Sequence, residues 1–168
     1  MKRLLLALCL VLSCAVSFAG PLKGEGDTKC LKESAKAVLS IDFSKATWEK
    51  KEDFKTWCGD TFSERETASV TNFTTAFNES SKGLQVATEG NDAKYKMVIE
   101  VKNFERKSAS IGFGRAHIKI YGTLKVVDAA SGETVCTYTI DGLSGGDDYV
   151  ETERFAKSFA KLGKELTK

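Results

Sequence analysis

The sequence has a single histidine, His117, and a single proline among its 168 residues. A zinc site uses three or four protein ligands, so His117 would need cysteine partners, and the cysteines lack the paired short spacing of such sites. A Cys-x-x-Cys redox motif is also absent. We therefore expect no metal, no other cofactor and no catalytic residues.

The chain also lacks an excess of charge of one sign. It carries 25 Lys and Arg residues against 23 Asp and Glu residues, a formal net charge of +2. Loss of the first 19 residues would remove two basic residues and no acidic one, leaving a neutral chain. Nucleic-acid binding depends on neutralising phosphates, so we expect no nucleic-acid partner.

Long apolar runs are missing after the amino terminus. The one such run, Leu4–Val16, follows Lys2 and Arg3 and is shorter than the roughly 20 residues that span a membrane. Ser17-Phe18-Ala19 then supplies the small residues that signal peptidase reads. This layout predicts a signal peptide over residues 1–19, cleaved between Ala19 and Gly20, and a periplasmic or secreted protein.

The same segment permits a lipoprotein signal. Ser13 precedes Cys14 as a small residue precedes the modified cysteine of a bacterial lipoprotein. However, the chain stays apolar from Cys14 through Phe18, where lipoproteins usually turn polar. Lipidation of Cys14, with membrane attachment through that anchor, is therefore the alternative to cleavage after Ala19.

Residues 20–168 are predicted to form a leader and one domain. Residues 20–34 combine glycines and charges with little periodicity, which predicts a flexible leader. Residues 35–168 have the length of a single domain and no internal repeat, linker or low-complexity tract. We expect a single α+β domain over residues 35–168.

Three cysteines remain after the predicted signal peptide, so complete internal pairing is impossible. Cys136 lies in the alternating run "TVCTYTI", where a free cysteine usually acts as a small buried hydrophobe. Cys30 and Cys58 lie in looser context on either side of the first strand candidate. We expect Cys30 and Cys58 to form the disulfide, if one forms in an exported protein.

Hydrophobic periodicity predicts an α+β two-layer sandwich in the order strand, helix, strands, helix. The sheet should be mostly antiparallel, because three long strands follow one another with short turns. Two amphipathic helices should cover it, the first opened by Thr61–Glu64 and Ser63–Glu66 capping boxes. The expected strands are residues 37–43, 84–88, 94–104, 111–127 and 134–140, and the helices follow Thr61 and Asp148. Residues 44–60 read as an irregular excursion with one helical turn.

The closing helix has the clearest pattern in the chain. Phe155, Phe159, Leu162 and Leu166 form one continuous apolar stripe at helical spacing, with lysines on the far side. We interpret this pattern as a helix that covers the sheet.

The stretch "SIGFGRAHIKIYG", residues 110–122, has a Gly-x-Gly spacing and the only histidine. A dinucleotide-binding loop needs a third glycine where His117 stands, and a helix after it, whereas an extended pattern follows here. The period of two instead predicts a central strand. Its even positions are small or apolar, and its glycines should let a covering helix or a bend come close.

The odd positions of this strand form a polar face. Arg115, His117, Lys119 and Tyr121 would all lie on it. We expect this face to be the binding surface. The alternative is a small cell-envelope hydrolase or thiol enzyme in which His117 pairs with Cys58 or Cys136, since strand neighbours can touch across a sheet.

Residues 84–168 resemble bacterial envelope proteins with a domain like the amino-terminal part of TolB. This family includes lipoproteins that activate penicillin-binding proteins and the curli-secretion lipoprotein. The resemblance rests on "YKMVIEVKNFE", the long strand after it, the hairpin "LKVVDAASGETVCTYTIDG" and the helix "RFAKSFAKLGKEL". It implies an exported, non-catalytic domain of α/β type that works by contacting another envelope protein. It implies nothing about oligomeric state.

Overall fold

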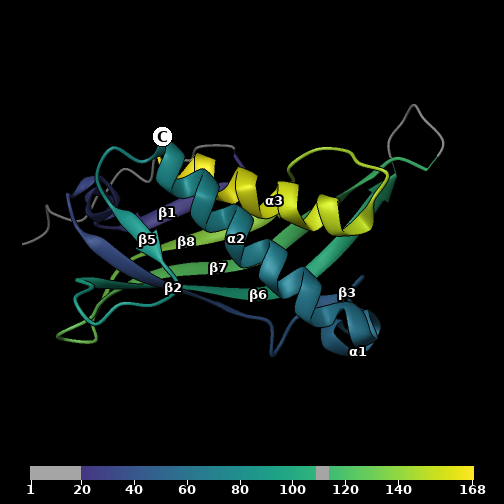
Figure 1. The fold of residues 1–168 in the computed structure, drawn as a ribbon, viewed down its shortest axis with the longest axis horizontal. Coiled ribbons are helices and arrows are strands. Elements are labelled where there is room, and N and C mark those ends of the chain that lie inside the picture. Colours follow the sequence, from purple (N-terminus) through teal and green to yellow (C-terminus); the bar gives the residue numbers. More distant parts are fainter. Residues whose placement is uncertain (1–19, 109–113) are drawn as a thin grey trace, which may run out of the picture.

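The computed structural model describes residues 20–108 and 114–168, which form one curved sheet and two long helices on one of its faces (Figure 1). The strands are β1 (Leu22–Gly26), β2 (Lys36–Asp42), β3 (Thr47–Trp48), β4 (Glu52–Asp53), β5 (Gln85–Ala87), β6 (Tyr95–Ser108), β7 (Ala116–Asp128) and β8 (Thr134–Leu143). The helices are α1 (Phe54–Cys58), α2 (Phe62–Ser80) and α3 (Glu151–Leu166), with short 3-10 turns η1 (Thr28–Lys32) and η2 (Gly59–Thr61).

The eight-stranded sheet has the order β1-β8-β7-β6-β2-β5, and β3 pairs with the end of β6 and with β4. β6, β7 and β8 form the predicted antiparallel meander. β2 runs parallel to both of its neighbours, β6 and β5. The predicted α+β sandwich with a mostly antiparallel sheet is thus confirmed.

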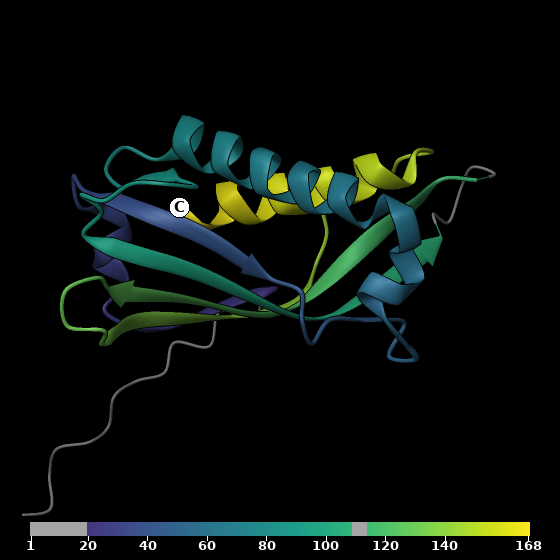
Figure 2. The same cartoon turned by 60° about the horizontal axis from the view of Figure 1, so that its bottom comes forward.

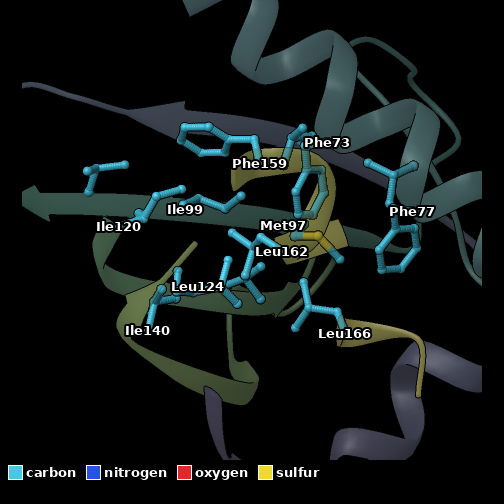
Figure 3. Packing of buried hydrophobic residues seen from close by; sticks show 14 of the residues in the cluster. Phe73, Phe77, Met97, Ile99, Ile120, Leu124, Ile140, Phe159, Leu162 and Leu166 are labelled. Carbon is cyan, nitrogen blue, oxygen red and sulfur yellow. The ribbon is translucent and has the colours of Figure 1, made fainter. Parts of the chain in front are cut away.

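α2 and α3 lie side by side on the same face of the sheet (Figure 2). The apolar stripe of α3 is fully buried there, from Phe155 at 0% exposed to Leu166 at 5%. Figure 3 shows side chains from both helices meeting those of the central strands. The core shown includes Phe73, Phe77, Met97, Ile99, Ile120, Leu124, Ile140, Phe159, Leu162 and Leu166. The helix that the sequence predicts as a cover has this role.

Gly122 in β7 confirms the expectation that a strand glycine admits a close approach, and here the approach is a bend. The register between β6 and β7 shifts between Val101 and Asn103, opposite Gly122. A Cβ atom on Gly122 would come within 2.3 Å of the Glu100 carbonyl oxygen. The strand next to a β-bulge therefore needs glycine at this position.

The predicted flexible leader is wrong for most of residues 20–34. Leu22–Gly26 forms β1, an edge strand that pairs with β8 in the register Leu22 to Ile140 and Gly26 to Cys136. η1 follows and buries Leu31. Only Leu22 is partly buried in β1, so backbone pairing with β8, and not a hydrophobic pattern, holds this strand in place.

The predicted capping boxes at the start of α2 are not formed. Thr61 is the N-cap residue, but its side chain makes no capping hydrogen bond. Its hydroxyl donates to the Cys58 carbonyl oxygen at 2.6 Å and accepts a hydrogen bond from Arg65. The Thr61 hydroxyl is thus bonded to the last residue of α1 and does not cap α2, because η2 brings the end of α1 directly against the start of α2. The single helical turn expected within residues 44–60 is α1.

Among the residues that the structure describes, none of the helices has the length and apolar character needed to cross a membrane.

Candidate functional site

Three of the four residues predicted to bind a partner lie in a row along β7, on the sheet face opposite α2 and α3. His117, Lys119 and Tyr121 alternate with Ile118 and Ile120, which are fully buried beneath the helices. Arg115 is exposed and directly precedes the strand. No helix of the described chain covers this second face (Figure 2). The four residues are called the β7 surface below.

Tyr121 is fixed by a carboxylate on the neighbouring strand. Its hydroxyl donates to Oε2 of Glu105 in β6 at 3.0 Å. Lys50, in the turn between β3 and β4, places Nζ 3.1 Å from Oε1 of Glu105, and Lys107 Nζ lies 3.6 Å from Oε2. The Lys50 ammonium holds the pKa of Glu105 below its ordinary value. Burial and the hydrogen bond to Glu105 raise the pKa of Tyr121, so both groups keep their ordinary protonation at neutral pH.

His117 is held by the loop that leads into α3. Its Nδ1 lies 2.8 Å from Oδ1 of Asp147. In the same region the Arg115 guanidinium lies over the Tyr149 ring, 5.6 Å from its centroid. Tyr149 and Val150 are 65% and 56% exposed and are the most exposed large hydrophobic side chains of the described chain. Polar and apolar groups therefore meet at this end of the sheet, as at protein-binding surfaces.

Arg154 holds this loop in position from beneath. It is 3% exposed, and its guanidinium donates to the carbonyl oxygens of Asp148, Tyr149 and Gly114 at 2.8–3.0 Å. The backbones of Ala116 and Asp148 also pair in an isolated antiparallel β-bridge. The start of β7 and the loop before α3 are thus one connected unit.

The charge of the β7 surface is mixed with a positive surplus. Glu105 is shared by two lysines and Asp147 contacts His117, while neither Arg115 nor Lys119 has an ion-pair partner among the residues that the structure describes. Such a surface suits a partner that carries acidic groups and hydrogen-bond acceptors.

Sequence reasoning missed the supporting residues Lys50, Glu105, Asp147, Tyr149 and Arg154. Glu105 is directly opposite Lys119 in the β6–β7 register, so the strand alternation of β6 could have identified it. The other four come from loops or from the helix, and their positions depend on how those segments pack.

The cysteines correct the predicted disulfide. Cys30, Cys58 and Cys136 are all buried free thiols, and the Sγ atom of Cys30 lies 3.4 Å from that of Cys136. The predicted Cys30–Cys58 pair is therefore wrong. The reason is the pairing of β1 with β8, which carries η1 to Cys136, whereas Cys58 ends α1 and lies near Arg65.

No cysteine sulfur hydrogen-bonds to His117 among the described residues. Cys136 is 2% exposed on the helix-covered side of the sheet, and His117 lies on the opposite side. Burial raises the pKa of Cys58, and the neighbouring Cys30 raises the pKa of Cys136. Neither thiol thus has the exposure and lowered pKa of a nucleophilic cysteine.

The structure also holds no group of three or more His, Cys, Asp and Glu side chains suited to a metal ion within residues 20–108 and 114–168. The predicted cleavage after Ala19 and the alternative lipidation of Cys14 fall on residues 1–19, outside the described part of the chain. Residues 109–113, which include the first glycine of the Gly-x-Gly spacing, also lie outside the described part of the chain.

Comparison with solved structures places this chain in a known fold. A dodecamer of a PelC variant from Paraburkholderia phytofirmans matches with a TM-score of 0.50 and 13% identity, over 88% of this chain and 98% of PelC. A second PelC dodecamer from that organism matches with a TM-score of 0.50 and 12% identity, over 88% and 96%. A neuraminyllactose-binding hemagglutinin homolog from Helicobacter pylori gives a TM-score of 0.45 at 15% identity, over 82% and 88%. At these identities the likeness to PelC is one of fold. No protein-family model and no curated protein matches the sequence.

Proposed function

We propose that this protein is an exported, non-catalytic accessory domain of the bacterial cell envelope, which binds another envelope protein through its β7 surface. The observation that carries the proposal is the row of His117, Lys119 and Tyr121 on the sheet face that the helices leave open. The fold shared with PelC and the resemblance of residues 84–168 to the TolB-amino-terminal-like domains support it.

The β7 surface is built to present its groups in fixed positions. Glu105 fixes the Tyr121 hydroxyl, and Asp147 fixes the His117 ring. A preorganised surface loses little side-chain entropy when a partner binds. Lys119 and Arg115 then supply the positive charges that steer an acidic partner.

Site-directed photo-crosslinking in cells tests this proposal. A photo-reactive residue at Lys119 should capture a partner protein that mass spectrometry identifies, and the same residue at Lys164, exposed on α3, should not. The K119E variant should weaken capture from a probe placed at Arg115. Equal capture from Lys119 and Lys164, or unchanged capture in K119E, would argue against the β7 surface.

The same preparation tests export and the absence of catalysis. Sequencing of the mature amino terminus should give Gly20, and a lipidated Cys14 would instead support the anchored form. Turnover of a substrate by the purified protein that His117→Ala abolishes would contradict the non-catalytic role.

Self-association is a second candidate, because the matching PelC structures are dodecamers. Within the described residues the sheet ends at β1 and β5. Among these residues β1 pairs only with β8, and an unpaired edge strand can pair with another chain. Light scattering on the purified protein distinguishes the candidates. A stable oligomer whose photo-crosslinks from Lys119 join two copies of this chain would favour self-association over a different partner.

A further inference from the structure

The thiols of Cys30 and Cys136 are buried next to each other, away from the third described cysteine. Their Sγ atoms lie 3.4 Å apart, and the residues are 1% and 2% exposed. A disulfide bond needs sulfur atoms about 2.05 Å apart, so small rotations of the two side chains bring them within bonding distance. Cys58, the third described cysteine, is near Arg65 at the other end of the fold.

Backbone contacts hold the two segments together without help from the sulfur atoms. Gly26 of β1 is opposite Cys136 of β8, and the next residue, Asp27, donates its amide to the Val135 carbonyl oxygen at 3.0 Å. A Cβ atom on Gly26 would come within 2.6 Å of that oxygen, so glycine permits the approach. η1 then folds back and places Cys30 over Cys136. The proximity is a product of the β1–β8 register.

We propose that Cys30 and Cys136 form a disulfide bond that fastens η1, and with it the edge strand β1, to β8. The oxidant is a low-molecular-weight or protein disulfide. The Cys30 thiolate attacks the oxidant, forming a mixed disulfide and releasing one thiol. The Cys136 thiolate then attacks the Cys30 sulfur and releases the second thiol. Each cysteine loses one proton, and the two electrons reduce the oxidant.

The burial of both sulfur atoms sets when this exchange takes place. A buried thiol is inaccessible to an oxidant, so the exchange occurs while η1 is undocked, during folding or a local opening of the sheet edge. Undocking of η1 exposes Cys30, which makes Cys30 the first nucleophile. If the protein is exported, as proposed above, the bond forms only after it leaves the reducing cytoplasm.

The bond would close most of the fold into one ring. Its two cysteines are 106 positions apart, and β2, α2, β5, β6 and β7 all lie between them. A loop of this length removes much of the freedom of the unfolded chain. Reduction should therefore lower the melting temperature by on the order of 10 °C.

Peptide mapping of the full chain tests the pairing. The protein is refolded with reduced and oxidised glutathione, denatured, alkylated without reduction and digested with trypsin. Cleavage after Lys and Arg places Cys30 in residues 30–32, Cys58 in residues 56–65 and Cys136 in residues 126–154, with the two amino-terminal cysteines in residues 4–23. We expect peptides 30–32 and 126–154 to be joined, and Cys58 to be alkylated. Alkylation of both Cys30 and Cys136, or a bond from either to Cys58, would overturn the proposal.

Thermal melting gives an independent readout. A reductant should lower the melting temperature of the oxidised wild type and of the C58S variant by the same amount. It should leave the C30S/C136S variant unchanged. If the C30S/C136S variant does not fold, the wild type and C58S with and without reductant still test the bond. A melting temperature that the reductant leaves unchanged in both proteins would refute it.

Discussion

The side-chain amide of Asn78 pairs with the backbone of Val86 as a neighbouring strand would. Its Nδ2 atom donates to the Val86 carbonyl oxygen at 2.8 Å, and its Oδ1 atom accepts from the Val86 amide at 2.8 Å. Val86 is the middle residue of β5, and β2 is the only strand that pairs with β5 within the described residues. A helix side chain thus satisfies the outer edge of the sheet.

We expect Asn78→Ala to lower the free energy of unfolding by about 2–4 kcal/mol, because it leaves the amide and carbonyl of a buried residue unpaired. Asn72→Ala on the same helix is the control. Asn72 donates only to the Ala68 carbonyl oxygen within its own helix, so its loss should cost within about 0.5 kcal/mol. Urea unfolding of both variants measures the difference, and equal costs would show that the Asn78 pairing contributes nothing specific.

Gly163→Ala should destabilise the protein, although alanine has a helix propensity about 1 kcal/mol more favourable than that of glycine. A Cβ atom at Gly163 would lie 2.8 Å from the Phe73 carbonyl oxygen and 2.9 Å from the Phe77 nitrogen of α2. Separating the two helices should cost about 1–3 kcal/mol. Denaturant unfolding checks the sign, with Lys164→Ala as the control on the exposed side of α3. A gain in stability for Gly163→Ala would mean that the helices can separate freely.

Arg154→Met should loosen the loop that supports the β7 surface. The substitution keeps much of the buried side-chain volume and removes the donors to the Asp148, Tyr149 and Gly114 carbonyl oxygens. Hydrogen bonds from a charged group contribute about 1.5–3 kcal/mol. Amide exchange should accelerate most at Ala116 and Asp148, whose backbones bond to each other. Uniform acceleration over the whole sheet would indicate general destabilisation instead.

Asp148 gives a pH dependence of defined sign. The hydrogen bond from Lys157 and the Val150 amide lower the pKa of Asp148 from 3.8 to about 2. Because the folded pKa lies below the unfolded value, the stabilising contribution is complete above pH 3.8 and is lost as the pH falls to about 2. NMR titration of the carboxyl group should give the low value, and Lys157→Met should raise it. A wild-type pKa near 3.8 would contradict the contact.

Most of the fold follows from local periodicity. The alternation of β7 separates Ile118 and Ile120 from His117, Lys119 and Tyr121, and the structure keeps that division. The stripe of α3 predicts the buried face of that helix for the same reason, because one face of each element meets a single environment. The position of the predicted binding residues follows from this division.

The predictions from the sequence are wrong where pairing between segments far apart in the chain determines the structure. β1 has no apolar alternation, and only the register with β8 makes it a strand. The same register overturns the expected Cys30–Cys58 pair, since spacing along the chain does not report the return of η1 to Cys136. Likewise, the parallel direction of β2 depends on the path that α1 and α2 take across the sheet.

Trp48 and Trp57 stack with ring centroids 3.8 Å apart and an interplanar angle of 12°. They are the only two tryptophans in the chain, and they join β3 to α1. Indole rings this close couple their electronic transitions. The far-ultraviolet circular dichroism of the protein should therefore contain a paired signal from this contact, and its loss would report the detachment of α1 without any added label.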